Sequence, residues 1–150
     1  MGHVYDFNDY IEDMELVLKQ LNLSEYHQRF IIAHSMGGAI ATRYLQTHPE
    51  HNFDGLILSS PMFGINLPCY LSPIAIPLSQ ILAAVSLQPN YAPGQQKYHS
   101  KPFEDNPLSQ SYDRYHWFRG LYRDKPELQV GGPSARWVWQ GLMAAKRCIL

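Results

Sequence analysis

Hydrophobic residues recur at helical spacing in two stretches of the first third of the chain. From Phe7 to Leu21 they are separated by acidic residues, a pattern that predicts an amphipathic helix over residues 7–21. Either Asp6 or Asn8 is a suitable cap for its first turn. A second helical pattern covers residues 39–46 and ends before Pro49.

Two short apolar runs, residues 29–33 and 53–59, alternate with these helices. Both are rich in aliphatic residues and are followed by polar or turn residues, so they predict strands buried on both faces. The order helix, strand, helix, strand is typical of a parallel sheet with helices packed on its faces. Residues 1–61 are therefore predicted to form an α/β unit.

The composition changes after Pro61, where most of the prolines lie and no further strand is predicted. The patterns indicate, in order, a helix over 71–87 interrupted near Pro77, a loop over 90–107, an amphipathic helix over 109–123, and a helix over 134–148 capped by Ser134. This second part is predicted to be helical.

A short motif between the first predicted strand and the next helix carries the clearest chemistry. It reads Ala33-His34-Ser35-Met36-Gly37-Gly38. A serine on such a strand–turn–helix stands clear of the sheet, and its hydroxyl can attack an acyl carbon. The backbone N–H of Met36, at the start of the helix, would then point at the oxyanion.

The structural residues of this motif depart only slightly from the usual Gly-x-Ser-x-Gly pattern. Ala33 takes the place of the first glycine, and Gly37 and Gly38 are small enough for the turn and the helix to pack closely. The simpler alternative is that Ser35 only caps a helix. The strand before it and the helix after it favour a nucleophile.

Several stretches in order resemble the α/β-hydrolase superfamily, and within it the bacterial lysophospholipase branch related to monoacylglycerol lipases. They are Gly2-His3-Val4 with Phe7-Asn8-Asp9-Tyr10, residues 32–40 around Ser35, Pro61-Met62-Phe63-Gly64-Ile65, and Val130-Gly131-Gly132-Pro133 leading to Trp137. The resemblance implies a partial α/β-hydrolase fold. Its parts are a sheet piece with a nucleophile elbow (1–61), a helical cap insertion (62–133), and a helix returning toward the core (134–150).

The resemblance also implies that the chain is an internal fragment. In the family, the catalytic acid and histidine follow later strands of the core, so we expect both to lie outside this chain. Asp113 and His116 are three residues apart on one predicted helix and would more readily form a surface pair than reach Ser35. His34 is expected to be a wall or supporting residue of the site, and His3 a loop residue.

Two functions of different classes follow from these expectations. The first is a serine hydrolase of fatty-acyl esters, a lysophospholipase-like enzyme that forms an acyl-enzyme on Ser35; another esterase or a peptidase is the alternative within the fold. The second is a catalytically inactive fragment, or the partner of a complementing chain. A sheet of two strands would expose apolar faces, and we expect such a chain to be poorly soluble by itself.

Composition and charge exclude several other classes. The formal net charge is −1, which does not provide the basic surface of a nucleic-acid binder. Cys69 and Cys148 are too few for a disulfide framework or a zinc site, and we expect neither a metal nor a cofactor.

The expected location follows from the apolar and basic stretches. The first residues have no secretory leader, and the most apolar stretch, residues 74–85, is too short to span a membrane. We expect a cytoplasmic protein that contacts the inner face of the membrane peripherally. The expected contact is an aromatic and basic cluster: Tyr112, Arg114, Tyr115, Trp117, Arg119, Tyr122 and Arg123.

Overall fold

The computed structural model describes residues 1–50, 52–66, 72–85, 89–106 and 108–150. Its helices and strands are, in order, α1 (Asn8–Gln20), β1 (Phe30–His34), α2 (Met36–Thr47), β2 (Gly55–Ser59), α3 (Ala75–Val85), α4 (Tyr112–Asp124) and α5 (Ala135–Cys148). Each predicted helix and strand is present. The helix α5 begins at the expected cap, where the Ser134 hydroxyl accepts a hydrogen bond from the Trp137 N–H at 3.0 Å.

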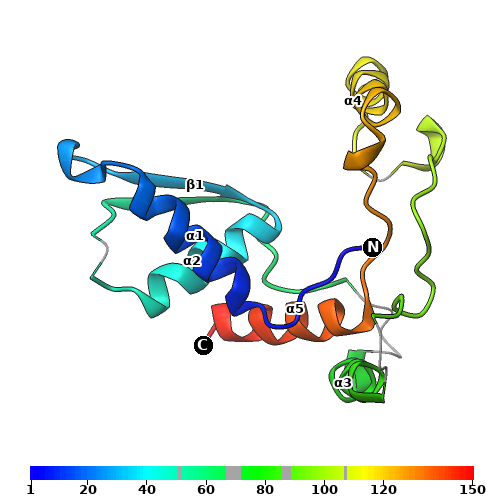
Figure 1. Cartoon of the computed structure of the whole chain (residues 1–150), viewed down its shortest axis with the longest axis horizontal. Coiled ribbons are helices and arrows are strands. Elements are labelled where there is room, and N and C mark those ends of the chain that lie inside the picture. The colour runs from blue at the N-terminus through cyan, green and yellow to red at the C-terminus, as the bar shows by residue number, and fades with distance from the viewer. Residues whose placement is uncertain (51, 67–71, 86–88, 107) are drawn as a thin grey trace.

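The two strands form a parallel pair, as predicted, with Phe30 opposite Gly55 and His34 opposite Ser59. Helices α1 and α2 lie on one face of this pair (Figure 1). The other face is open: Ile32 and Ile57, which lie opposite each other, are 76% and 56% exposed. The prediction of strands buried on both faces is therefore wrong for the described structure, because the described residues place helices against one face only.

The core lies where α2 meets α1 and α5. Its buried residues include Phe7, Ala39, Ala144 and Cys148, with Met36 and Met62 among the partly buried residues around them. Alanines at the contact allow the helices to approach closely. The Cys148 thiol donates to the Ala39 carbonyl oxygen at 3.6 Å, and burial raises its pKa. Cys148 is therefore a residue of the hydrophobic core.

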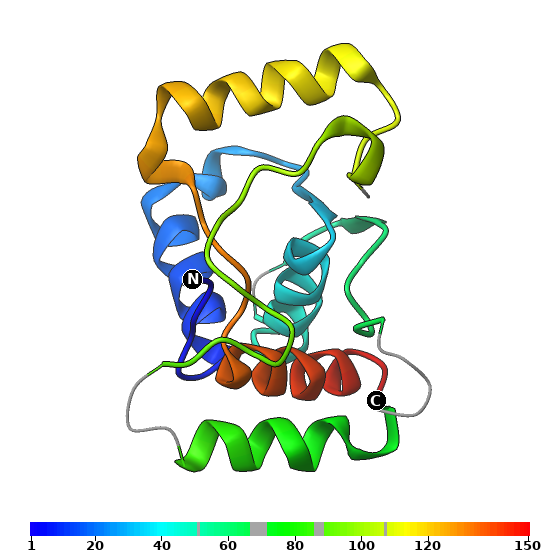
Figure 2. The same ribbon diagram turned by 90° about the vertical axis from the view of Figure 1, so that its right-hand side faces the viewer.

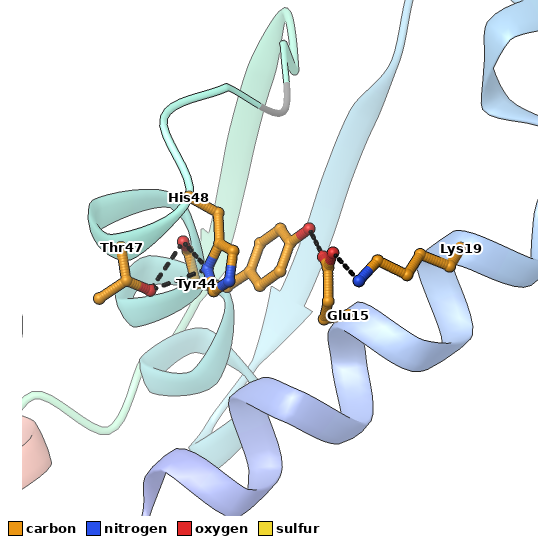
Figure 3. Close-up of polar contacts among 5 residues, drawn as sticks. All are labelled: Glu15, Lys19, Tyr44, Thr47 and His48. Atoms are coloured by element: carbon orange, nitrogen blue, oxygen red, sulfur yellow. Dashed lines mark hydrogen bonds and ion pairs between the residues drawn. The ribbon is translucent and has the colours of Figure 1, made fainter.

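A buried tyrosine joins α1 to α2 (Figure 3). The Tyr44 hydroxyl donates to the Glu15 carboxylate at 2.5 Å, and Lys19 pairs with the same carboxylate at 2.9 Å. On the other side the His48 ring stacks on the Tyr44 ring, with 4.7 Å between their centroids. Burial, followed by the hydrogen bond to Glu15, raises the pKa of Tyr44 well above its usual value, so the hydroxyl remains a donor.

The helix α3 packs along α5 (Figure 2). The interruption predicted near Pro77 is wrong, because Pro77 is the third residue of α3. In the first turn of a helix a backbone N–H has no intrahelical acceptor, so proline removes no hydrogen bond there. The outer residues of the predicted helix, 71 and 86–87, lie outside the described residues.

Two extended segments, residues 91–98 and 129–133, connect α4 to the rest of the molecule; we call them the stalk (Figure 1). They are joined by hydrogen bonds from the Ala92 N–H to the Pro133 carbonyl (3.0 Å) and from the Gly132 N–H to the Gln96 carbonyl (2.9 Å). A Cβ at Gly131 would lie 2.9 Å from the Gln96 oxygen. The glycine pair therefore lets the two segments touch.

The N-terminal segment is hydrogen-bonded to the base of the stalk. The Gly2 N–H donates to the Gly132 carbonyl at 3.1 Å, and the Ser134 N–H donates to the Gly2 carbonyl at 2.8 Å. Next to them His3 Nδ1 lies 2.8 Å from the hydroxyl oxygen of Ser134, which is 1% exposed. His3 is thus a structural residue that holds the start of the chain against the start of α5.

The stability of the protein is expected to fall as the pH drops below about 6.5 because of His3. Burial, and secondarily Arg136, lowers the pKa of His3 in the folded state. Between the unfolded and the folded pKa the unfolded chain binds the proton more readily, so acid favours unfolding. Melting temperatures measured between about pH 7.5 and pH 5.5 test this. His3→Asn, which keeps a polar partner for Ser134 but does not titrate, should weaken the dependence of the melting temperature on pH. The same dependence in the variant and the parent would contradict this prediction.

Candidate active site

Ser35 lies on a sharp turn between β1 and α2, in a backbone conformation that few non-glycine residues adopt. Its φ is 52° and its ψ is −124°. The flanking hydrogen bonds hold it there: its N–H donates to the Ser59 carbonyl at 3.1 Å, and its own carbonyl accepts from Gly38 at 3.0 Å and from Met62 at 2.9 Å. Such a conformation costs about 1–3 kcal/mol and persists only where its surroundings impose it.

The two glycines that follow differ in their surroundings. A Cβ at Gly38 would lie 2.8 Å from Pro61 Cβ and 3.0 Å from Pro61 Cα, whereas a Cβ at Gly37 would have nothing within 4 Å. Close packing therefore requires glycine at position 38 and leaves room at position 37. The turn presses α2 against the segment that follows β2.

A second strained serine, which no sequence pattern predicted, lies at the end of the neighbouring strand. Ser60 has a φ of 45° and directly follows β2. Because His34 and Ser59 are paired, both strands turn sharply at the same edge of the sheet. Pro61 favours an extended backbone with negative φ for the residue before it, so the sequence offered no signal for the positive φ of Ser60.

The side chains around the turn leave Ser35 accessible. Ser35 and His34 are both exposed, and Ala33 is partly buried. Met36 is the first residue of α2, so its N–H is among those at a helix start that have no intrahelical acceptor. The positive end of the helix dipole adds to this donor. The arrangement presents a hydroxyl beside a site that favours negative charge.

The described residues provide no acid or base that is hydrogen-bonded to the Ser35 side chain. Within the described ranges, its hydroxyl makes no hydrogen bond with a histidine or a carboxylate. His116 lies against the rings of Tyr112 and Tyr115, at centroid distances of 4.0 and 5.4 Å. The described structure shows no hydrogen bond between His116 and Asp113, so the pairing considered from their spacing is not formed.

The remaining histidines after the turn are engaged elsewhere. His48 stacks on Tyr44 at the C-terminal end of α2, and His99 Nδ1 lies 3.1 Å from Gln96 Nε2 beside the stalk. His51 is outside the described residues. Sequence order placed these imidazoles after the serine, but the fold does not place those it describes within reach of it.

The described residues contain neither a cluster that could bind a metal nor a helix that could span a membrane. Among them, no group of three or more histidine, cysteine, aspartate or glutamate side chains is arranged to hold a metal ion. No helix in the described ranges has both the length and the hydrophobicity needed to span a bilayer.

The comparisons with known proteins are consistent with this geometry. The chain is 36% identical over 156 residues to lysophospholipase L2 of Escherichia coli, an alignment that covers 99% of this chain and 44% of the relative. It is 34% identical to a probable lysophospholipase L2 of Haemophilus influenzae, covering 97% and 46%. The chain thus spans about half the length of the curated relatives it matches.

A solved structure and a family profile complete the comparison. The crystal structure of a monoacylglycerol lipase from Paleococcus ferrophilus superposes with a TM-score of 0.64 at 19% identity, over 98% of this chain and 49% of that one. The profile of the family described as serine aminopeptidase S33 matches residues 1–149. The chain belongs to this serine aminopeptidase S33 family, and its fold is part of an α/β-hydrolase fold.

Proposed function

We propose that Ser35 is the nucleophile of a serine hydrolase that cleaves fatty-acyl esters, with lysophospholipids or monoacylglycerols as substrates. The observation that supports this most directly is the strained backbone of Ser35 between β1 and the start of α2. Relatives named as lysophospholipases and a structural neighbour named as a monoacylglycerol lipase support the substrate class.

In the proposed reaction the Ser35 hydroxyl oxygen attacks the ester carbonyl carbon while its proton passes to a histidine base. The Met36 N–H holds the resulting oxyanion at the start of α2. The carbonyl re-forms as the alcohol leaves with a proton, and water then hydrolyses the acyl-enzyme in the same way. The histidine and its acid are supplied from outside these 150 residues, since the described structure offers no base at Ser35.

A second candidate function is that of an inactive chain, or of a partner that completes another polypeptide. The specific observations that favour it are the unassisted Ser35 hydroxyl and the open apolar face containing Ile32 and Ile57. Within the first class, the name of the family includes peptidase activity, and a shared fold does not separate esterases from peptidases.

Fluorophosphonate labelling separates the two candidates. An activated serine reacts with the probe, whereas a hydroxyl without a base reacts slowly. Digestion with trypsin gives a peptide of residues 30–43, in which Ser35 is the sole serine, so mass spectrometry identifies the modified residue. Probe on this peptide, in lysate of the source cells, supports the hydrolase. Unmodified peptide, with other serine hydrolases labelled in the same lysate, supports the inactive chain.

We further propose that the protein is cytoplasmic and that α4 makes peripheral contact with the inner face of the membrane. Tyr112 and Trp117 on α4 are 58% and 68% exposed, and tyrosine, tryptophan and arginine favour such an interface. Tyr112→Ser should weaken sedimentation with anionic vesicles about threefold or more. The matched control is Tyr26→Ser, because Tyr26 is 64% exposed and lies outside α4. Equal losses in both variants would contradict this contact.

A further inference from the structure

A cavity of about 620 Å³ lies between α4 and the loop that precedes it, at the far end of the stalk. Its size is within the range of small-molecule sites. Its walls are largely apolar and aromatic, from Leu108, Tyr115, Trp117 and Phe118. Tyr115 is buried, while Leu108 and Trp117 are 84% and 68% exposed. The cavity therefore offers an apolar surface that is open to solvent at its mouth.

The charged groups of this cavity are all of one sign. Lys101, Arg114 and Arg119 line it, and no acidic side chain does so among the described lining residues. Within the described part of the chain, neither Lys101 nor Arg114 forms an ion pair. Two exposed cations beside an apolar wall, without a carboxylate to neutralise them, favour a ligand that is both anionic and apolar.

The third cation is held in place by its neighbours. The Arg119 guanidinium donates to the Tyr98 hydroxyl at 3.1 Å and lies over the Tyr115 ring, 5.1 Å from its centroid. A cation fixed against an aromatic ring in this way stays charged and keeps its orientation. Arg119 therefore contributes a permanent positive potential to the cavity.

The described residues of the loop that forms the opposite wall are held by hydrogen bonds. The Asn106 side chain accepts from the N–H groups of Leu108 (3.0 Å) and Ser109 (2.9 Å) and donates to the Phe103 carbonyl (2.7 Å). The Tyr115 hydroxyl donates to the Lys101 carbonyl. The cavity is thus formed before a ligand arrives, which lowers the entropy cost of binding.

We propose that this cavity binds a single-chain anionic amphiphile, with the anion between Lys101 and Arg114 and the alkyl chain against Leu108, Trp117 and Phe118. The shared chemistry has two sources, the phosphate of a lysophospholipid and the carboxylate of a released fatty acid. The inference deepens the proposed function and rests on it for the identity of the ligand; the binding chemistry itself comes from the cavity.

Binding of monomeric surfactants by the full chain tests this proposal, in a Ser35→Ala background so that no hydrolysis is involved. Tryptophan fluorescence and calorimetry would follow decyl phosphate, decanoate and decyltrimethylammonium, each below its critical micelle concentration. We expect the anions to bind and the cation of equal chain length to bind at least about tenfold more weakly. Tighter binding of decyl phosphate would identify the lipid headgroup, and tighter binding of decanoate the fatty acid.

Two charge-removing variants locate the site. Lys101→Gln and Arg114→Gln should each weaken binding of the preferred anion about tenfold. Lys125→Gln, which removes an exposed lysine outside the cavity, should change it less than about twofold. Circular dichroism confirms that the variants remain folded.

Three results would overturn the proposal: no binding, equal binding of anion and cation, or equal effects of all three variants. If the cavity did not bind the surfactants, fluorophosphonate labelling of Ser35 would be unaffected. If Ser35 did not carry out the proposed reaction, binding of surfactants in the cavity would be unaffected.

Discussion

Replacing Ser35 with alanine is expected to reduce hydrolysis of lysophosphatidylcholine by about 10⁴-fold or more. The hydroxyl is the atom that forms the acyl-enzyme, and members of a catalytic triad act as a unit, so the remaining groups recover little of the rate. Release of fatty acid is measured in a chimera in which this chain replaces the aligned segment of the Escherichia coli relative. That relative supplies the rest of the polypeptide.

The matched control for Ser35→Ala is Ser60→Ala. Ser60 is a serine of similar φ at the end of the adjacent strand, so its replacement reproduces any effect of placing alanine in a strained backbone position. We expect this control to retain most of its activity. If the Ser35→Ala chimera still hydrolysed the ester at the parental rate, Ser35 would have no part in the mechanism.

Gly38→Ala is expected to lower the melting temperature by up to roughly 8 °C. In a helix interior, alanine is usually more stable than glycine by about 1 kcal/mol. At position 38 the new Cβ would meet Pro61 at 2.8 Å and its backbone Cα at 3.0 Å, and relieving such a contact costs about 1–3 kcal/mol. Because Met62 bonds to Ser35, the shift also moves the turn, and we expect activity to fall with stability.

Gly37→Ala provides the control for this prediction. The two glycines are neighbours at the start of α2, but a Cβ at Gly37 meets nothing within 4 Å. Thermal unfolding followed by circular dichroism should therefore show a lower melting temperature for Gly38→Ala and an unchanged or slightly higher one for Gly37→Ala. Equal destabilisation by the two substitutions would show that backbone preference, rather than contact with Pro61, sets the requirement for glycine.

The sequence predicted the elements and the turn because both depend on local pattern. Apolar spacing located α1, the Ser134 cap located the start of α5, and the strand–serine–helix order located the sharp bend at Ser35. Burial of the strands was predicted wrongly, since an aliphatic run such as residues 29–33 does not reveal whether a second covering layer lies in the same chain. The exposure of Ile32 depends on whether another element packs against that face of the sheet.

The features around α4 were beyond sequence reasoning for a similar reason. The spacing of Asp113 and His116 allowed a pair, but His116 packs against Tyr112 instead, a choice decided by tertiary contacts. The cavity depends on the Arg119 contact with Tyr98, 21 residues away. Local periodicity does not reveal such contacts. The sequence therefore indicates only a surface cluster for the basic side chains between positions 112 and 123.

The stalk gives the molecule a modular character. Both of its segments leave from one junction, where Gly2, Gly132 and Ser134 are hydrogen-bonded together, and α4 makes its closest element contacts with the short turn that follows it. We therefore expect that the residues beyond this junction can be lengthened, shortened or exchanged without disturbing the backbone around Ser35. If the proposed cavity and the proposed nucleophile are both correct, ligand preference and reactivity can be changed separately, and the residues between the two segments are the ones to redesign.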